Sequence, residues 1–196
     1  TAAPGTTTGK IGTASTPIAG TAFNAKINCV DANWNLVTGA NPAVSITTTD
    51  PYDTDLSDTL VSGTKTFSVT LKKAVTSLTS LTASDTGLFY NSYTTQNLTI
   101  NPGTGVKLQL LVPGETADPG NTGNNGKITN PIARTVGVAY DATVNCTDAQ
   151  WNTNPSGNPT VTITSSDANA QLPAASGLSA GTKTFSIILN TAGSGT

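Results

Sequence analysis

Apolar and polar residues alternate along several short segments of the chain. In AFNAKINC (residues 22–29) and AYDATVNC (residues 139–146), every second position is apolar or aromatic. These positions are Phe23, Ala25, Ile27 and Cys29 in the first segment, and Tyr140, Ala142, Val144 and Cys146 in the second. KTFSVTL (residues 65–71) follows the same rule with Phe67, Val69 and Leu71. A period of two indicates β-strands that bury one face.

The segments between these predicted strands are rich in turn-forming residues. Gly, Asn, Asp and Pro interrupt the alternation roughly every ten residues, as in proteins built from short strands. Strong helix formers are scarce, because the chain has a single Glu, a single Arg and no Met. Aliphatic inward residues on short strands are typical of two packed sheets. We therefore expect an all-β protein of the β-sandwich type, with almost no helix.

One stretch of sequence occurs twice. INCVDANWN (residues 27–35) and VNCTDAQWN (residues 144–152) are offset by 117 positions, and the match continues into NPAVSITTTD and NPTVTITSSD. After a shift of one residue, GTKTFSVTL (residues 63–71) aligns with GTKTFSIIL (residues 181–189). A repeat of this length indicates two similar domains in tandem. We place them at residues 1–103 and 104–196.

The register of the repeat indicates which strands each copy contains. VKLQLLVPGE (residues 106–115) opens the second copy, and nothing ahead of Thr1 corresponds to it. Thr196 aligns with Leu78, so residues 79–105 have no counterpart in the second copy. We expect the first domain to lack its opening strand and the second to lack its closing strands. The gaps would be filled by copies of the chain or by adjacent repeats of a longer chain; the alternative is that the sequence boundaries cut through the repeats.

These motifs resemble a known family, the immunoglobulin-like tandem repeats of large bacterial secreted and surface proteins. The resemblance rests on AGTAFNAKINCVDANWNLV (residues 19–37), SGTKTFSVTL, AGTKTFSIILNTAG and KLQLLVPGETADPG (residues 107–120), and it covers nearly the whole chain. It implies two immunoglobulin-like β-sandwich domains in tandem, at the cell surface or outside the cell. The cysteines are a departure, because such repeats usually carry a small apolar residue at that position.

The charge and composition of the chain limit the classes of partner and the kinds of chemistry to be expected. Charged residues make up 10% of the chain, the net charge is -2, and no run of one sign occurs. Nucleic acid and anionic membranes are therefore not expected as partners, and LQLLV is too short an apolar run to insert into a membrane. The chain has no His and only two Cys, which removes the usual bases and transition-metal ligands. We expect no enzyme and no cofactor.

The repeated DANWN and DAQWN segments carry the candidate polar site. Asp31, Asn33 and Asn35 alternate in the first copy, and Asp148, Gln150 and Asn152 alternate in the second. Alternating oxygen ligands could hold calcium, but one carboxylate per segment is poor in charge. The alternative is a turn in which each Asp accepts hydrogen bonds from the nearby backbone. Asp31, Asn33, Asn35, Asp148 and Asn152 are thus weak metal candidates. Cys29 and Cys146 are expected to be buried free thiols.

Aromatic residues supply the candidate interface. GLFYNSYTTQ (residues 87–96) concentrates Phe89, Tyr90 and Tyr93 in one predicted loop, which either forms a contact patch or folds back over the domain junction. Trp34 and Trp151 are expected to cap the core, with sugar stacking as the alternative. The sequence favours a structural repeat unit of an extracellular bacterial filament or surface array, assembling head to tail. The alternative is an adhesin or accessory module that binds a ligand, with surface glycans as partners.

Overall fold

The computed structural model describes residues 2–193, apart from the side chains of Ser77 and Leu78. Thr1 and Thr196, on which the register comparison drew, lie outside this range. The described chain is all-β, with antiparallel sheets and no helix, so the predicted fold class is confirmed at this level. None of its elements could therefore cross a membrane as a helix. It forms two compact units, Thr1–Asn101 and Pro102–Thr196, close to the boundary that the repeat predicts.

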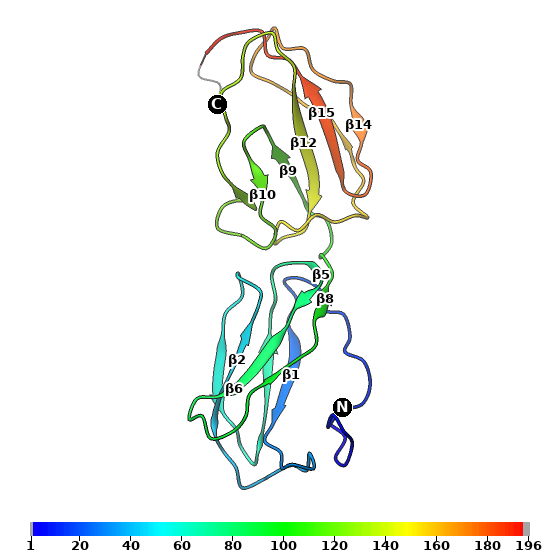
Figure 1. Cartoon of the computed structure of the whole chain (residues 1–196). Coiled ribbons are helices and arrows are strands. Elements are labelled where there is room, and N and C mark those ends of the chain that lie inside the picture. Colours follow the sequence, from blue (N-terminus) through cyan, green and yellow to red (C-terminus); the bar gives the residue numbers. More distant parts are fainter. Residues whose placement is uncertain (1, 194–196) are drawn as a thin grey trace. The chain divides into compact units, whose positions relative to one another are not determined.

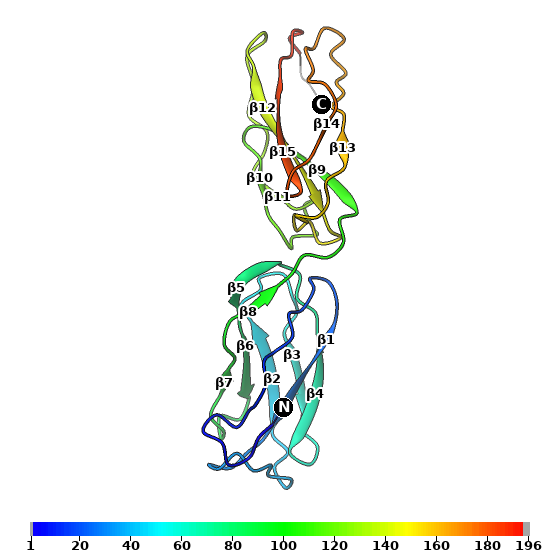
Figure 2. The same cartoon turned by 90° about the vertical axis from the view of Figure 1, so that its right-hand side faces the viewer.

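The described residues of the first unit form eight strands in three antiparallel sheets. The strands are β1 (Phe23–Asn28), β2 (Ala43–Thr48), β3 (Leu56–Thr59), β4 (Thr64–Val69), β5 (Val75–Thr79), β6 (Leu81–Asp85), β7 (Tyr93–Thr94) and β8 (Leu98–Ile100). The sheets have the orders β1-β4, β3-β2-β6-β7 and β5-β8. Figure 2 shows β2 between β3 and β6 in the largest of them.

The core of the first unit lies between its sheets. The alternating residues Phe67 and Val69 of β4 meet Val44 and Ile46 of β2 and Leu81 of β6, and all five are buried. Residues of β1, among them Phe23 and Ile27, pack against this cluster but stay partly exposed. The period-two pattern therefore identifies the inward faces correctly. Sheets facing each other across a shared apolar core make the arrangement consistent with a β-sandwich.

Up to residue 193, the second unit has seven strands, also in three antiparallel sheets. They are β9 (Lys107–Leu111), β10 (Thr116–Ala117), β11 (Lys127–Ile128), β12 (Tyr140–Thr147), β13 (Thr160–Val161), β14 (Ser176–Gly177) and β15 (Thr182–Ile187). The orders are β15-β12-β9, β10-β11 and β13-β14. Figure 1 shows β12 between β9 and β15. Its core is smaller and consists of Val144, Cys146, Val161, Leu178 and Phe185, with Ile163 beside them.

Equivalent strands of the two units differ in their partners. β1 corresponds to β12 and β4 to β15, but β12 also pairs with β9, whereas β1 pairs with β4 and with no other strand of residues 2–193. β2 lies between β3 and β6 and is 6 residues long, while its counterpart β13 pairs only with β14 and is 2 residues long.

Candidate functional site

The first unit contains an open groove of about 1070 Å³. One wall is β1, which contributes Ala25 and Ile27, and the floor includes Val44 and Leu81 of the facing sheet. The hairpin of residues 2–10 and the start of β7 complete the lining. We refer to this space, between the β1 edge and β6–β7, as the β1 groove. Its walls are mainly apolar. It runs along the edge of β1 opposite β4, with which no strand of residues 2–193 pairs.

The same position in the second unit is occupied by β9. β9 runs antiparallel to β12, with Lys107 opposite Thr147, Gln109 opposite Asn145 and Leu111 opposite Thr143. The Val106 N–H donates to the Thr147 carbonyl at 2.8 Å and extends the pairing. The repeat places Ile27, Asn28 and Cys29 of β1 where Val144, Asn145 and Cys146 stand in β12. The β1 groove is therefore the place that a strand like β9 would fill.

Residues of β12, which pairs with β9, are more buried than their counterparts in β1, which has no such partner strand among residues 2–193. Val144 is 2% exposed, whereas its counterpart Ile27 is only half-buried. Asn145 is buried and Asn28 is half-buried. The contrast is largest for the aspartates that follow, since Asp148 is 1% exposed and Asp31 is exposed. Ile27, Asn28 and Asp31 are thus each more exposed to solvent than their repeat counterparts in the second unit.

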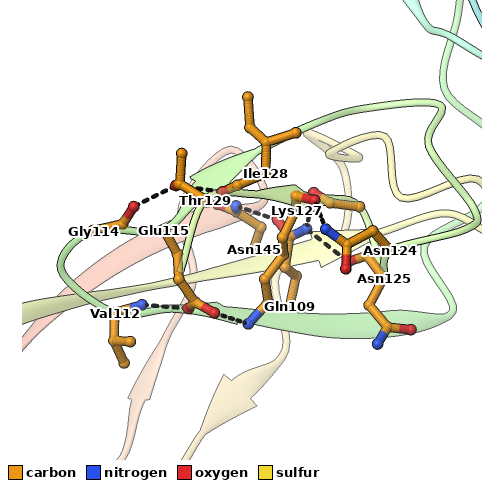
Figure 3. A network of polar contacts seen from close by, with 11 residues as sticks. Gln109, Val112, Gly114, Glu115, Asn124, Asn125, Lys127, Ile128, Thr129 and Asn145 are labelled. Atoms are coloured by element: carbon orange, nitrogen blue, oxygen red, sulfur yellow. Dashed lines mark hydrogen bonds and ion pairs between the residues drawn. The ribbon is translucent and has the colours of Figure 1, made fainter. Parts of the chain in front are cut away.

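Gln109 anchors β9 through its side chain, which is 2% exposed. Its Nε2 donates to the carbonyl of Gly126 at 2.7 Å and to that of Asn125 at 3.2 Å. Its Oε1 accepts a hydrogen bond of 3.1 Å from Nδ2 of Asn145. Figure 3 shows the amide between β12 and the loop that precedes β11. Every polar atom of this buried amide group is hydrogen-bonded, which a buried amide requires for stability.

An ion pair supports the same network. Lys127 Nζ lies 2.9 Å from Glu115 Oε1, and Glu115 Oε2 accepts a hydrogen bond of 3.0 Å from the Val112 N–H (Figure 3). Both side chains are largely buried. Glu115 thereby ties the end of β9 to β11, the second strand of the hairpin that covers Gln109. The only Glu of the chain thus has a structural role in which it closes the turn after β9.

The buried pair of Gln109 and Asn145 corrects the sequence analysis. Alternation places Asn145 on the outward face of its strand, where it would meet solvent. In the structure Asn145 is buried against Gln109, whereas Leu108 and Leu110 of β9 are 50% and 41% exposed. The hairpin between β10 and β11 covers the polar face of β9, and the leucines lie on the side of Val144 and Cys146. The signal that sequence reasoning missed is the Asn at the outward position in both repeats, Asn28 and Asn145.

The DANWN and DAQWN segments form turns around their aspartates. Asp31 Oδ1 accepts from the N–H groups of Asn33 and Asn35, both at 2.8 Å, and Asn35 Nδ2 donates to Oδ2 at 3.0 Å. The side-chain hydrogen bond from Asn35, followed by its backbone N–H, lowers the pKa of Asp31. Asp148 accepts the same set from Gln150 and Asn152. The carboxylates are thus used by amide donors, and the described residues include no cluster of three or more His, Cys, Asp or Glu that could hold a metal ion.

The tryptophans pack against glycines of the hairpins that precede β1 and β12. Trp34 and Trp151 are half-buried and share a φ of 65°. A Cβ added to Gly9 would lie 2.3 Å from Trp34 Cδ2, and one added to Gly126 would lie 2.3 Å from Trp151 Cβ, so only glycine fits there. Lys107 Nζ of β9 stacks over the Trp151 ring at 4.3 Å. The tryptophans are thus packing residues beside the strand site.

The remaining candidates lie at the edge of the groove or inside the core. Phe89 is 88% exposed, Tyr90 is 45% exposed, and Tyr93 belongs to β7 and not to the predicted loop. The Asp85 carboxylate holds this segment through the N–H groups of Gly87, Phe89 and Tyr90, and these bonds, that of Gly87 first, lower the pKa of Asp85. Cys29 and Cys146 are buried and free.

The fold and site together define an all-β protein of packed antiparallel sheets with an open strand-sized groove beside β1. Comparison with known proteins adds nothing to this class, because no family model, no curated protein and no solved structure matches the chain.

Proposed function

We propose that the chain is a structural repeat module of an extracellular bacterial filament or surface array, in which two immunoglobulin-like β-sandwiches in tandem assemble head to tail with other copies. The observation that carries this proposal is the β1 groove. It combines an unpaired strand edge with an apolar floor, while the second unit closes the equivalent edge with β9. The cell-surface location follows from the resemblance of the repeat motifs to surface proteins.

An open strand edge beside an apolar groove favours association. Unpaired N–H and C=O groups along an edge are a template for a strand from another chain. Ala25 and Ile27 stay partly exposed at this edge, so a docked strand would remove apolar area from water as well as completing the ladder. Contacts in which each molecule accepts a strand at such an edge and donates one to the next molecule form an open-ended series.

The surface composition supports an assembled structural role. Only 10% of the residues are charged and the net charge is -2, so copies repel one another weakly. The described residues contain no cluster of three or more His, Cys, Asp or Glu side chains that could hold a metal ion. The conserved features of the two repeats are instead turns, tight glycines and packing residues. Together these properties favour a mechanical or adhesive role.

The test measures assembly with and without the β1 edge. The Cys29 N–H donates to the Gly63 carbonyl at 2.8 Å, so in an antiparallel ladder the amides of Lys26 and Asn28 point to the other, open edge. Lys26→Pro removes one of these amides without removing a hydrogen bond to β4, and Lys26→Ala is the matched control. Sedimentation and negative-stain microscopy should show concentration-dependent, open-ended assembly that Lys26→Pro abolishes and Lys26→Ala retains. A wild-type chain that stays monomeric over the range from about 1 µM to 1 mM would contradict the proposal.

A second candidate function is ligand binding by an adhesin or accessory module. The exposed rings of Phe89 and Tyr90, held by Asp85 at the edge of the groove, favour it. Exposed aromatic side chains are the usual platform for stacking a sugar or for anchoring a protein partner. Binding on a glycan array that is lost in Phe89→Ala and Tyr90→Ala, with assembly unchanged, would favour this candidate over the first.

A further inference from the structure

We infer that the β1 groove receives a β-strand of the β9 type, in the register that β9 takes on β12. This inference rests on the proposed function, and it specifies the partner segment and the contacts that recognise it. The second unit provides the template, because there the strand and its site belong to one chain. The incoming residues that correspond to Leu108, Gln109 and Leu110 would face Cys29, Asn28 and Ile27 respectively.

Asn28 is prepared to bind the amide of an incoming Gln. Thr64 Oγ1 donates to Asn28 Oδ1 at 2.8 Å, as Thr182 Oγ1 donates to Asn145 Oδ1 at 2.7 Å. This contact fixes the orientation of each Asn amide and leaves Nδ2 to donate toward the open edge. In the second unit Nδ2 of Asn145 binds Gln109. In the first unit no residue of the described range accepts a hydrogen bond from Nδ2 of Asn28.

The backbone acceptor for the same amide is also in place. In the second unit the Gly126 carbonyl accepts from the Asp118 N–H at 2.6 Å and from Gln109 Nε2 at 2.7 Å. In the first unit the Gly9 carbonyl accepts from the Ala3 N–H at 2.8 Å. Gly9 packs on Trp34 as Gly126 packs on Trp151, with the same φ of 67°. The groove therefore offers the Nδ2 donor and the Gly carbonyl acceptor between which a Gln side chain is held in the second unit.

The aliphatic residues of such a strand fit the first unit better than the second. Leu108 and Leu110 are 50% and 41% exposed in the second unit, whose buried core is small. Their counterparts in the β1 groove would face Val44 of β2 and Leu81 of β6, which line its floor. The same strand would thus bury more apolar area in the first unit, and apolar burial is the main favourable term in such contacts. This asymmetry favours a strand that has leucines on both sides of its Gln.

The contacts of the flanking residues are reproduced in part. Lys107 Nζ donates to the Ala149 carbonyl at 2.9 Å and stacks on Trp151. In the first unit the repeat counterparts of these two residues are Ala32 and Trp34. Gly103 N–H donates to Asp148 Oδ2 at 2.8 Å, and Asp31 is the exposed counterpart of that acceptor. The Gly103 carbonyl accepts a hydrogen bond from Asn154 Nδ2. The counterpart of Asn154 in the first unit is Val37, whose side chain has no donor. The incoming strand should therefore be held firmly from its Lys onward and less firmly before it.

The experiment titrates the full chain into a fluorescently labelled peptide of residues 104–115, TGVKLQLLVPGE, and follows fluorescence anisotropy. We expect saturable binding at micromolar concentration. Replacing the Gln by Ala in the peptide should weaken binding about tenfold or more, because it removes hydrogen bonds on both sides of the amide. A peptide in which the Leu and Gln of residues 108 and 109 exchange places has the same composition and should weaken binding at least as much.

Protein variants locate the site. Asn28→Asp keeps the acceptor for Thr64 and replaces the Nδ2 donor by an oxygen, so it should weaken binding about tenfold or more. Asn97→Asp makes the same change at an exposed residue of the same unit that does not line the groove, and it should leave the peptide affinity unchanged. Binding should also slow amide exchange at Lys26 and Asn28. Circular dichroism of each variant shows whether the fold is retained, and the peptide variants test the register with the wild-type protein.

The outcomes separate this inference from the proposed function. No binding of the peptide, binding indifferent to its Gln, or equal loss in the Asn28 and Asn97 variants would overturn the strand site, even if the chain assembles. Binding that depends on the Gln and on Asn28 supports the strand site, even if the chain alone stays monomeric; in that case the proposed assembly is what fails.

Discussion

The Gln109→Ala substitution measures how strongly a buried amide holds β9 in the second unit. Gln109 is 2% exposed and is hydrogen-bonded to Gly126, Asn125 and Asn145. Truncation removes these bonds and leaves Nδ2 of Asn145, which is itself buried, without its acceptor. A net hydrogen bond contributes about 1 kcal/mol and a stranded buried donor costs about 1–3 kcal/mol, so we expect a loss of about 2–4 kcal/mol in the free energy of unfolding of the second unit.

The assay is urea unfolding followed by Trp fluorescence. Each unit contains a single Trp, so a Trp34→Phe background lets Trp151 report the second unit alone. Gln171→Ala, which truncates an exposed Gln of the same unit, is the control and should change stability by less than about 0.5 kcal/mol. In an Asn145→Ala background the Gln109→Ala loss should shrink, because no donor is then left stranded. A Gln109→Ala loss no larger than that of the control would refute the reasoning.

Four further predictions concern the repeated features of the two units. Asp148→Ala should lower the free energy of unfolding of the second unit by about 2–4 kcal/mol, because the N–H groups that donate to its buried carboxylate lose their acceptor. Asp31→Ala should lower that of the first unit by less, and equal losses in urea unfolding would contradict this. The hydroxyl of Thr191, followed by the N–H of Asn169, lowers the pKa of Asp167 to about 2 from 3.8, so its contribution to stability should be complete above pH 4 and be lost as the pH falls toward 2; an NMR titration midpoint near 3.8 would count against it. Amide exchange should be fast at Lys26 and Asn28 and slow at Thr143 and Asn145, whose N–H groups face β9; similar protection at both sites would show that β1 has a partner strand. A thiol reagent should label neither Cys29 nor Cys146 without denaturant, because both are buried, and rapid labelling of the native chain would disprove it.

The strands of the core could be predicted from sequence, because their burial follows local alternation. Phe67 and Val69 of β4 and Val44 and Ile46 of β2 lie on the inward faces that a period of two assigns to them. The repeat also indicated that β1 and β12 are equivalent and that a strand like β9 accompanies only one of them within this sequence. These features depend on neighbours in the chain or on the comparison of its two halves.

The polar face of β9 could not be predicted, because its burial depends on a distant segment. Gln109 is the one polar residue of LQLLV, and it is buried because the hairpin of β10 and β11 covers it and accepts its hydrogen bonds. The exposure of Phe89 likewise depends on Asp85, whose carboxylate binds the N–H groups of the following loop. In each case a tertiary contact overrides the local signal.

The central claim, that copies assemble through the β1 groove, is tested most directly by a high-resolution cryo-electron microscopy structure of the assembled chain. The account predicts a strand of a neighbouring molecule along β1, antiparallel to it, with an amide side chain hydrogen-bonded to Asn28 and to the Gly9 carbonyl. Contacts between molecules at any other surface, with the β1 edge still exposed to solvent, would contradict it.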